Sequence, residues 1–332
     1  MSRSIALAAA LAAALVAAPP AAVQAAAPTE RIVLKFGHIT PPGSLHDLAA
    51  QEFARRVNAQ LEGRVEVRVY GNSALGTDEE MVKGIRTGAV DMFLPGGVMS
   101  TVDPIFGIFE LPYLIDDRDH MRRATENRAV QHALYPKALA KGMRILGIWE
   151  HGFKQVTNNT RPIVRPADLR DLKIRVPSAV WRLRTFQAFG ASPAAAPWKD
   201  VYDLLKTGRM DGQEAALTLF MSAGIQHVQK YLSLTDHVYT PAYLVINEDV
   251  YRKLPKDARR VLTRVGYEMA EWSRKEGARL DRELMARLPP TIEVNEVDKD
   301  AFFRASIPLY EQFASEVPGG TILIKTIQGL RR

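Results

Sequence analysis

Single strands and amphipathic helices alternate along residues 32–94, and this order constrains the fold more than any other feature of the sequence. Apolar residues occupy alternate positions in residues 32–36 and again in residues 65–69, which is typical of short strands. Between these segments, apolar residues recur at helical spacing over residues 49–61. Because helices that alternate with single strands cover both faces of a sheet, we expect an α/β fold.

A second helix and a third strand are predicted immediately afterwards. Thr77 and Glu80 form the pattern of a capping box at a helix start, and Gly88 is placed to end that helix. Residues 89–94 then return to a strand pattern. The strand and helix order is therefore repeated before residue 95.

The segment at the end of this helix has a similar counterpart in the second half of the chain, and we call this similarity the echo. The segment Thr-Gly-Ala-Val-Asp-Met at 87–92 resembles the segment Thr-Gly-Arg-Met-Asp-Gly at 207–212. Both predict a helix, a glycine stop and a strand. The echo indicates two similar α/β lobes, and two unrelated helices that each end at a glycine are the alternative.

The length of the chain also favours two domains. Its 332 residues exceed the size, about 250–300 residues, beyond which single cores stop growing. Pro255 and Pro289 bracket one unbroken helical pattern, which is roughly 45 Å long at about 1.5 Å per residue. A helix of this length can brace two lobes.

The first residues match a secretory signal peptide. Arg3 precedes an uncharged run, residues 5–18, that is too short to span a membrane, and residues 23–25 offer a cleavage site with small side chains. We predict export to the periplasm and cleavage after Ala25, which removes residues 1–25 from the mature protein. Mass spectrometry of the periplasmic fraction tests this prediction, and a mature protein that keeps Met1 would contradict it.

Sequence patterns for catalysis are missing. The chain has 0 Cys, which excludes disulfides, thiolate metal sites and cysteine nucleophiles. Its 7 His show no metal-ligand spacing, and most are expected to be surface or structural residues. Residues 71–75 and 190–194 begin like a nucleophile elbow but lack its final glycine. We therefore predict a binding protein without enzymatic turnover, metal or cofactor, and a periplasmic hydrolase is the alternative.

The charge pattern argues against a nucleic-acid partner. The formal net charge is +7, but Lys and Arg are scattered among acidic residues. A nucleic-acid interface gathers its basic residues in a patch or stripe. The net charge instead favours an encounter with small anions.

Arg175 stands near the end of a predicted strand, residues 173–177. Its planar guanidinium matches a carboxylate with two parallel hydrogen bonds. Arg175 is therefore a candidate ligand-binding residue, although spacing alone favours a surface ion pair.

The segments around Arg175 belong to a series of blocks that covers nearly the whole mature chain. The other blocks lie at 70–76, 111–114, 152–158, 161–162, 168–169, 190–193, 198–202 and 211–214. In this order, they resemble the solute-binding proteins of tripartite ATP-independent periplasmic (TRAP) transporters, the DctP-like family.

The resemblance implies a two-lobed α/β periplasmic binding protein fold of type II-like topology, with a long bracing helix. It implies one lobe at 31–150 plus 240–275 and another at 151–239 plus 276–332, and a cleft between them that closes on a ligand. It further implies that Arg175 clamps the carboxylate of a small organic acid. The ligand then passes to the membrane permease subunits, which are the only contact with the membrane. A ligand-dependent partner of a membrane sensor is a further alternative that uses the same cleft.

Two departures from the family pattern bear on the ligand. The family often has a second arginine where this chain has Lys154, which keeps the charge and loses the planar fork. Ala215 stands where the family commonly has an asparagine, so an amide that contacts the ligand is missing. These departures favour an aromatic or branched monocarboxylate over succinate or malate.

Four more residues are candidates for the ligand site. Trp198 either lines the cleft or packs at the start of a helix. His38 follows the first strand and either donates a hydrogen bond to the ligand or stabilises its loop. Phe93 and Tyr243 lie in strands predicted at the rim of the cleft, and burial in the core is the alternative for both.

Overall fold

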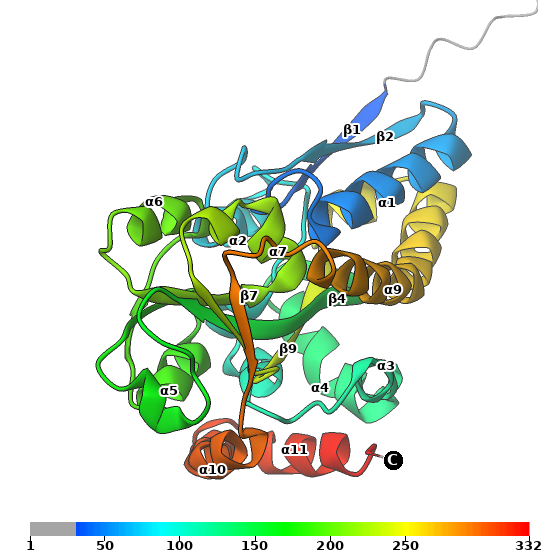
Figure 1. Ribbon diagram of the computed structural model, residues 1–332. Helices are drawn as coiled ribbons and strands as arrows, with labels where there is room; N and C mark the ends of the chain where they lie inside the picture. The colour runs from blue at the N-terminus through cyan, green and yellow to red at the C-terminus, as the bar shows by residue number, and fades with distance from the viewer. Residues whose placement is uncertain (1–30, 332) are drawn as a thin grey trace, which may run out of the picture. The chain divides into compact units, whose positions relative to one another are not determined.

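The structure is a computed structural model that describes residues 31–331 of the chain, and the predicted signal peptide lies outside these residues. Residues 31–331 belong to one compact unit, in which helices flank a 10-stranded sheet (Figure 1). None of the helices in this part of the chain combines the length and apolar composition that a membrane span requires.

The N-terminal elements follow the predicted strand and helix order. They are β1 (Ile32–Gly37), α1 (Leu45–Leu61), β2 (Val65–Tyr70), α2 (Asp78–Thr87) and β3 (Met92–Phe93). β1 pairs in parallel with β2 and with β3, as an α/β arrangement requires. The predicted capping box is present, because Glu80 N donates to Thr77 Oγ1 at 3.3 Å and Thr77 N donates to Glu80 Oε2 at 2.7 Å.

The third strand is shorter than the predicted segment 89–94. The helix ends at Gly88, whose φ of 77° is left-handed, and the next two backbone amides, of Ala89 and Val90, both donate to Gly84 O. These amides close the helix end and are not available to a strand ladder. Pairing with β1 therefore begins only at Met92.

Two long antiparallel strands join the two ends of the sheet. β4 (Met143–Asn158) pairs along its first part with β9 (Tyr239–Asn247), which in turn pairs with β3. The last part of β4 pairs with β7 (Gly212–Ala216) and β8 (Tyr231–Leu234). The predicted lobe boundary between residues 150 and 151 therefore falls inside β4.

The remaining strands extend the sheet beyond β7. β5 (Lys173–Val176) pairs in parallel with β7 and with β6 (Ser192–Ala195), and β10 (Glu293–Glu296) pairs with β8. The main order of the sheet is β2-β1-β3-β9-β4-β7-β5-β6. Parallel strands covered by helices occur at both ends of this order, which confirms the predicted α/β class.

The sequence echo corresponds to equivalent structure. Gly208 follows α6 (Val201–Lys206) with a φ of 67°, as Gly88 follows α2. Asp91 Oδ2 then accepts a hydrogen bond from the backbone N of Lys35 in β1, and Asp211 Oδ2 accepts one from the backbone N of Lys173 in β5. Both aspartates thus tie the segment after a helix to a neighbouring parallel strand, which supports the interpretation as a repeat.

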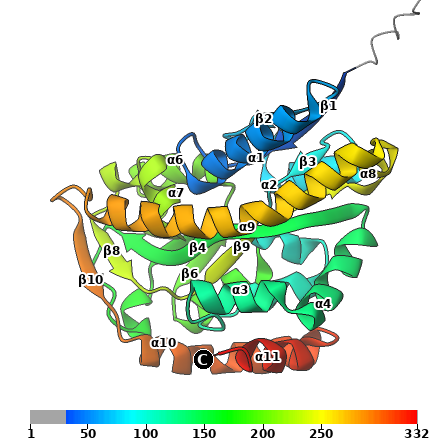
Figure 2. The same ribbon diagram turned by 90° about the vertical axis from the view of Figure 1, so that its right-hand side faces the viewer.

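The predicted long helix is α9 (Lys256–Met285), whose 30 residues extend about 45 Å. It packs against β4 and α1 and reaches α7 (Leu217–Ser222) (Figure 2). Its glycine at position 277 permits a close approach to β4, because a Cβ atom there would lie 2.5 Å from Glu150 Oε1. The helix therefore contacts elements from both ends of the sheet.

The other helices cover the sheet and close the far end of the unit, where α10 and α11 lie together (Figure 1). The α-helices are α3 (Arg118–Glu126), α4 (Arg128–Leu139), α5 (Val180–Ala188), α8 (Glu248–Lys253), α10 (Lys299–Glu316) and α11 (Gly320–Gln328). Short 3-10 helices are η1 (Gly97–Thr101), η2 (Pro104–Glu110), η3 (Pro166–Leu169), η4 (Trp198–Asp200) and η5 (Ile225–His227).

Candidate functional site

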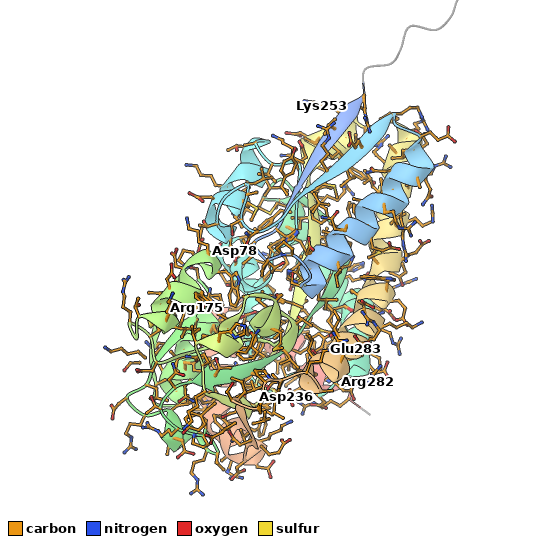
Figure 3. The ribbon with its side chains drawn as sticks, turned by 45° about the horizontal axis from the view of Figure 1, so that its top comes forward. Asp78, Arg175, Asp236, Lys253, Arg282 and Glu283 are labelled. Carbon is orange, nitrogen blue, oxygen red and sulfur yellow. The ribbon has the colours of Figure 1, made fainter. Side chains whose placement is uncertain are left out.

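A cavity of about 50 Å³ with several charged side chains in its lining lies between elements from the two ends of the sheet. Residues of α1, α2 and η1 line it from one end, and residues of β4, β5 and β7 line it from the other. Asp78 of α2 and Arg175 of β5, both labelled in Figure 3, line this same cavity. The cavity is therefore the candidate ligand site.

The structure brings together four of the seven predicted site residues. Arg175, Lys154, Ala215 and Trp198 all line the cavity. The pairing of β4 with β7 sets Gln155 opposite Ala215, so Lys154 and Ala215 lie on adjacent strands. The pairing of these strands thus brings Lys154 and Ala215, which are 61 positions apart in the sequence, close together.

Arg175 is buried, with 4% of its surface exposed, and one edge of its guanidinium group is fixed by hydrogen bonds. Its Nε and Nη2 atoms donate to Ala196 O at 2.9 and 2.6 Å, and its guanidinium carbon lies 5.3 Å from the centroid of the Trp198 ring. Its Nη1 atom has no hydrogen bond within residues 31–331. Burial lowers the pKa of Arg175 to about 10, which still leaves it charged at neutral pH. A buried arginine without a carboxylate partner in the described chain is not the surface ion pair that spacing alone favoured.

Lys154 is the second buried cation of the cavity, with 4% of its surface exposed. No carboxylate of the described residues forms an ion pair with its ammonium group. Burial lowers the pKa of Lys154 to about 7, although the charge of Glu214 partly opposes this shift. An anion in the cavity would favour the charged form of this lysine.

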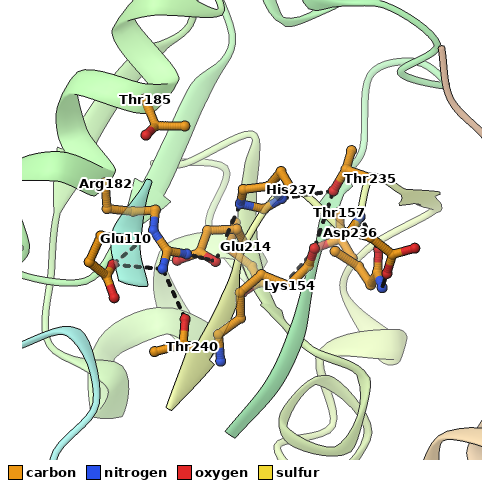
Figure 4. A network of polar contacts seen from close by, with 12 residues as sticks. Glu110, Lys154, Thr157, Arg182, Thr185, Glu214, Thr235, Asp236, His237 and Thr240 are labelled. Atoms are coloured by element: carbon orange, nitrogen blue, oxygen red, sulfur yellow. Dashed lines mark hydrogen bonds and ion pairs between the residues drawn. The ribbon is translucent and has the colours of Figure 1, made fainter. Parts of the chain in front are cut away.

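A third buried cation, Arg182, was not predicted. Its Nη1 donates to Glu214 Oε2 at 2.5 Å, its Nη2 donates to Glu110 Oε2 at 2.7 Å, and Nη2 also contacts Thr240 Oγ1 at 3.1 Å (Figure 4). Arg182 lies on the buried face of α5 with Trp181, Thr185 and Phe186. An arginine within such an apolar face is a sequence signal for a buried ion pair, and it can be recognised once the helix is placed.

Three further residues of the lining were also missed. His46, in the first turn of α1, and His151, in β4, lie with their tilted rings 4.1 Å apart between centroids, and both line the cavity. Asp78 is the first residue of α2, and burial raises its pKa to about 7. Their sequence neighbours do not indicate that the three residues line one cavity, because this happens only when α1, α2 and β4 come together in the fold.

The other three predicted residues do not line the cavity. His38 is buried, with its Nδ1 3.0 Å from Thr40 Oγ1 and its Nε2 3.5 Å from Asp47 Oδ1, so it stabilises the loop after β1. Phe93 and Tyr243 lie in the core, with 0% and 2% of their surfaces exposed, because helices cover the sheet at β3 and β9. The Tyr243 ring packs edge-on against Phe106.

The net charge of the cavity lining favours the binding of one anion. When Lys154 is protonated, Arg175, Lys154 and Arg182 carry three positive charges, against two negative charges on Glu110 and Glu214. When Asp78 is also protonated, the lining has one net positive charge. No group of three or more metal-ligating side chains occurs within residues 31–331, so nothing in this part of the chain is arranged as a metal centre.

Comparisons with known proteins match a family model to most of the chain. Residues 36–316 match the family model DctP, described as bacterial extracellular solute-binding protein, family 7. The 2,3-diketo-L-gulonate-binding periplasmic protein of Escherichia coli (strain K12) is 30% identical over 298 residues, which are 89% of this chain and 90% of that protein.

Solved structures of the same architecture contain different acids. A TRAP periplasmic solute-binding protein from Polaromonas sp. JS666 bound to D-erythronate superposes with a TM-score of 0.86 at 29% identity, covering 91% of this chain and 99% of the other. A TRAP periplasmic solute-binding protein from Sulfurospirillum deleyianum with bound succinate gives the same TM-score, identity and coverage.

Proposed function

This chain belongs to the DctP family of bacterial extracellular solute-binding proteins, family 7, and from that membership we propose that it captures a small hydroxylated monocarboxylate for a TRAP transporter. Membership confirms the resemblance found in the sequence and makes the chain a binding protein rather than a hydrolase. The proposal extends to the periplasm as its location and to membrane permease subunits as the recipients of the ligand.

The observation that carries the proposal is the free edge of Arg175 in a buried cavity. Ala196 holds Nε and Nη2 from one side, while Nη1 has no partner within residues 31–331. A carboxylate that approaches Nη1 and the second hydrogen of Nη2 would receive two parallel hydrogen bonds. The fixed guanidinium would lose little freedom on binding, which favours affinity.

The charge of the lining supports one carboxylate rather than two. Glu110 and Glu214 are already paired with Arg182, so they leave the charges of Arg175 and Lys154 to the ligand and to Asp78. A second carboxylate of the ligand would have to share this end of the cavity with Asp78 or lie beside two buried glutamates. Like charges in a buried site are costly.

The remaining lining supports hydroxyl groups on the ligand. Thr240, His46 and His151 offer polar atoms, and relatives of this chain are named for 2,3-diketo-L-gulonate or hold D-erythronate. Ala215 packs with Trp198 in an apolar cluster, so its methyl group borders only a small part of the lining. We therefore propose a hydroxylated acid in place of the bulky apolar acid that Ala215 alone suggested.

The test is a ligand panel that varies the carboxylate and hydroxyl groups of D-erythronate. We expect D-erythronate to raise the midpoint of thermal unfolding, since a ligand at 100 times its Kd adds about 2.7 kcal/mol of stability. Erythritol keeps the hydroxyl groups but lacks the carboxylate, and succinate has a second carboxylate and no hydroxyl groups. Both should bind at least about tenfold more weakly. Equal stabilisation by erythritol and D-erythronate would contradict a carboxylate site.

Affinity for the anion should fall as the pH rises above neutrality. The pKa of Lys154 is lowered to about 7, so in the free protein this lysine loses its charge above that pH. The pKa of Asp78 is raised to about 7, so Asp78 gains a negative charge over the same range. Both changes weaken anion binding, and we expect at least about a tenfold rise in Kd between about pH 6 and about pH 9.

Calorimetry in buffers of different ionisation enthalpy measures the proton linked to this change. At about pH 8, binding should take up a proton, because the bound anion restores the charge of Lys154. The variant Lys154→Met should lose that part of the uptake. A Kd that stays constant across the range would show that neither group faces the bound anion.

A further inference from the structure

His46, which is buried, and His151, which is partly buried, differ from the buried histidines His120 and His237 in their hydrogen bonds. Neither ring nitrogen of His46 or of His151 has a hydrogen-bond partner within residues 31–331, although all four atoms are shielded from solvent. By contrast, His120 Nε2 contacts Ile327 O at 2.8 Å, and His237 has one paired nitrogen, Nδ1, which lies 2.8 Å from Thr235 Oγ1, although its Nε2 has no partner. Buried polar atoms nearly always have a partner, so this pair requires an explanation.

The pair is part of the lining of the ligand cavity. His46 comes from the first turn of α1 with 3% of its surface exposed, and His151 comes from the middle of β4. The backbone at Gly96 also approaches His151, since a Cβ atom at Gly96 would lie 3.0 Å from His151 Nδ1. The unpaired nitrogens therefore belong to two closely packed side chains of the cavity lining.

Lys154 is a charged neighbour of both histidines. It lowers the pKa of each, in addition to the larger effect of burial. Besides burial, the charge of Arg175 contributes to the lowered pKa of Lys154. Lys154 is therefore a neighbour of Arg175 as well as of the histidine pair.

The protonation state of the pair determines which groups it can bind. Burial and the charge of Lys154 both favour the neutral form of each imidazole. A neutral imidazole presents one donor and one acceptor. A hydroxyl group matches both, whereas an ionised carboxylate only accepts.

We propose that His46 and His151 are specificity-determining residues that bind hydroxyl groups of a ligand whose carboxylate is held at Arg175. This inference rests on the proposed function, since it assumes that the carboxylate is held at Arg175. A buried site that hydrogen-bonds a hydroxyl group strongly rejects an analogue that lacks it, because the groups of the site then remain unpaired. Selectivity for hydroxylated acids would follow from the unpaired nitrogens of the free protein.

The experiment compares D-erythronate with butyrate, which has the same four-carbon chain and carboxylate but no hydroxyl group. Calorimetry on the unmodified protein should give a Kd for butyrate at least about a hundredfold higher than that for D-erythronate. In His46→Leu and in His151→Leu, this ratio should fall by about tenfold or more. His132→Leu, at an exposed histidine of α4, is the matched control and should keep the ratio.

The ratio separates recognition from general damage, because a loss of folded protein affects both acids equally. His46→Gln keeps a donor and an acceptor and should retain the ratio within about threefold. Nitrogen-15 spectra of the unmodified protein provide a second readout: D-erythronate should shift the ring nitrogens of His46 and His151, and butyrate should not. An unchanged ratio in both leucine variants, or ring resonances that respond equally to the two acids, would overturn the inference.

The two proposals fail in different ways. If D-erythronate and butyrate bind with equal affinity and erythritol does not bind, the carboxylate site stands and the role of the histidine pair is wrong. If none of the acids binds while erythritol does, the proposed function fails and the inference fails with it.

Discussion

Replacing Arg182 with methionine is expected to lower the free energy of unfolding by about 3–5 kcal/mol. Arg182 is 1% exposed and forms ion pairs with both Glu110 and Glu214, which are themselves almost fully buried. Without the guanidinium, two carboxylates would remain in a site of low polarity with no cation paired to them. Urea unfolding in the absence of ligand measures the loss.

The matched control is Arg279→Met in α9. Arg279 is also paired with two glutamates, Glu276 and Glu283, but its side chain is 46% exposed. Exposed pairs contribute about 0–1 kcal/mol, so the control should change stability little. Adding Glu110→Gln and Glu214→Gln to Arg182→Met should recover part of the lost stability, because the uncompensated charges are then removed. A loss below about 1 kcal/mol for Arg182→Met would show that water reaches this cluster.

Arg175→Lys is expected to weaken the binding of D-erythronate by at least about thirtyfold, or ~2 kcal/mol. The substitution keeps the positive charge but removes the planar guanidinium group. One edge of that group donates hydrogen bonds to Ala196 O, and another edge is available to the ligand. A lysine ammonium is a compact charge that does not present two parallel donors. Calorimetry on folded variant protein measures the effect.

Arg184→Lys is the control for this substitution. Arg184 lies on α5, where it pairs with Glu316 at the surface and does not line the cavity. Its replacement should leave the Kd of D-erythronate unchanged. Equal affinities of the Arg175→Lys variant and the unmodified protein would remove Arg175 from the ligand site.

The predicted parts of the fold depend on interactions between residues close in the sequence. The capping box at Thr77, the glycine stop at Gly88 and the proline-bracketed helix α9 each follow from a few neighbouring side chains. The length of β3 was wrong because its pairing competes with the closing hydrogen bonds to Gly84. Local patterns predict where such a strand belongs, but not how many residues it keeps.

The predicted parts of the site came mostly from the family resemblance. Arg175 and Lys154 stand in matching blocks, and the structure places both at one cavity. His46 and Arg182 were missed because their contacts join distant parts of the chain: His46 meets His151, and Arg182 meets Glu110 and Glu214, which are 72 and 32 positions away from it. Phe93 and Tyr243 could not be placed from the sequence for a different reason. An aromatic residue in a strand pattern is compatible both with the rim of a cleft and with the core, where the structure places these two.

The course of β4 has a mechanical consequence for the ligand. The strand is irregular between Glu150 and Gly152, where its register against β9 shifts and Gly152 adopts a φ of 91°. His151 lies at this irregularity and Lys154 lies just beyond it, so any flexing of the strand there alters the distance between the two side chains. A molecule in contact with both side chains would restrain the backbone of β4 at this irregular segment. Its release would remove the restraint.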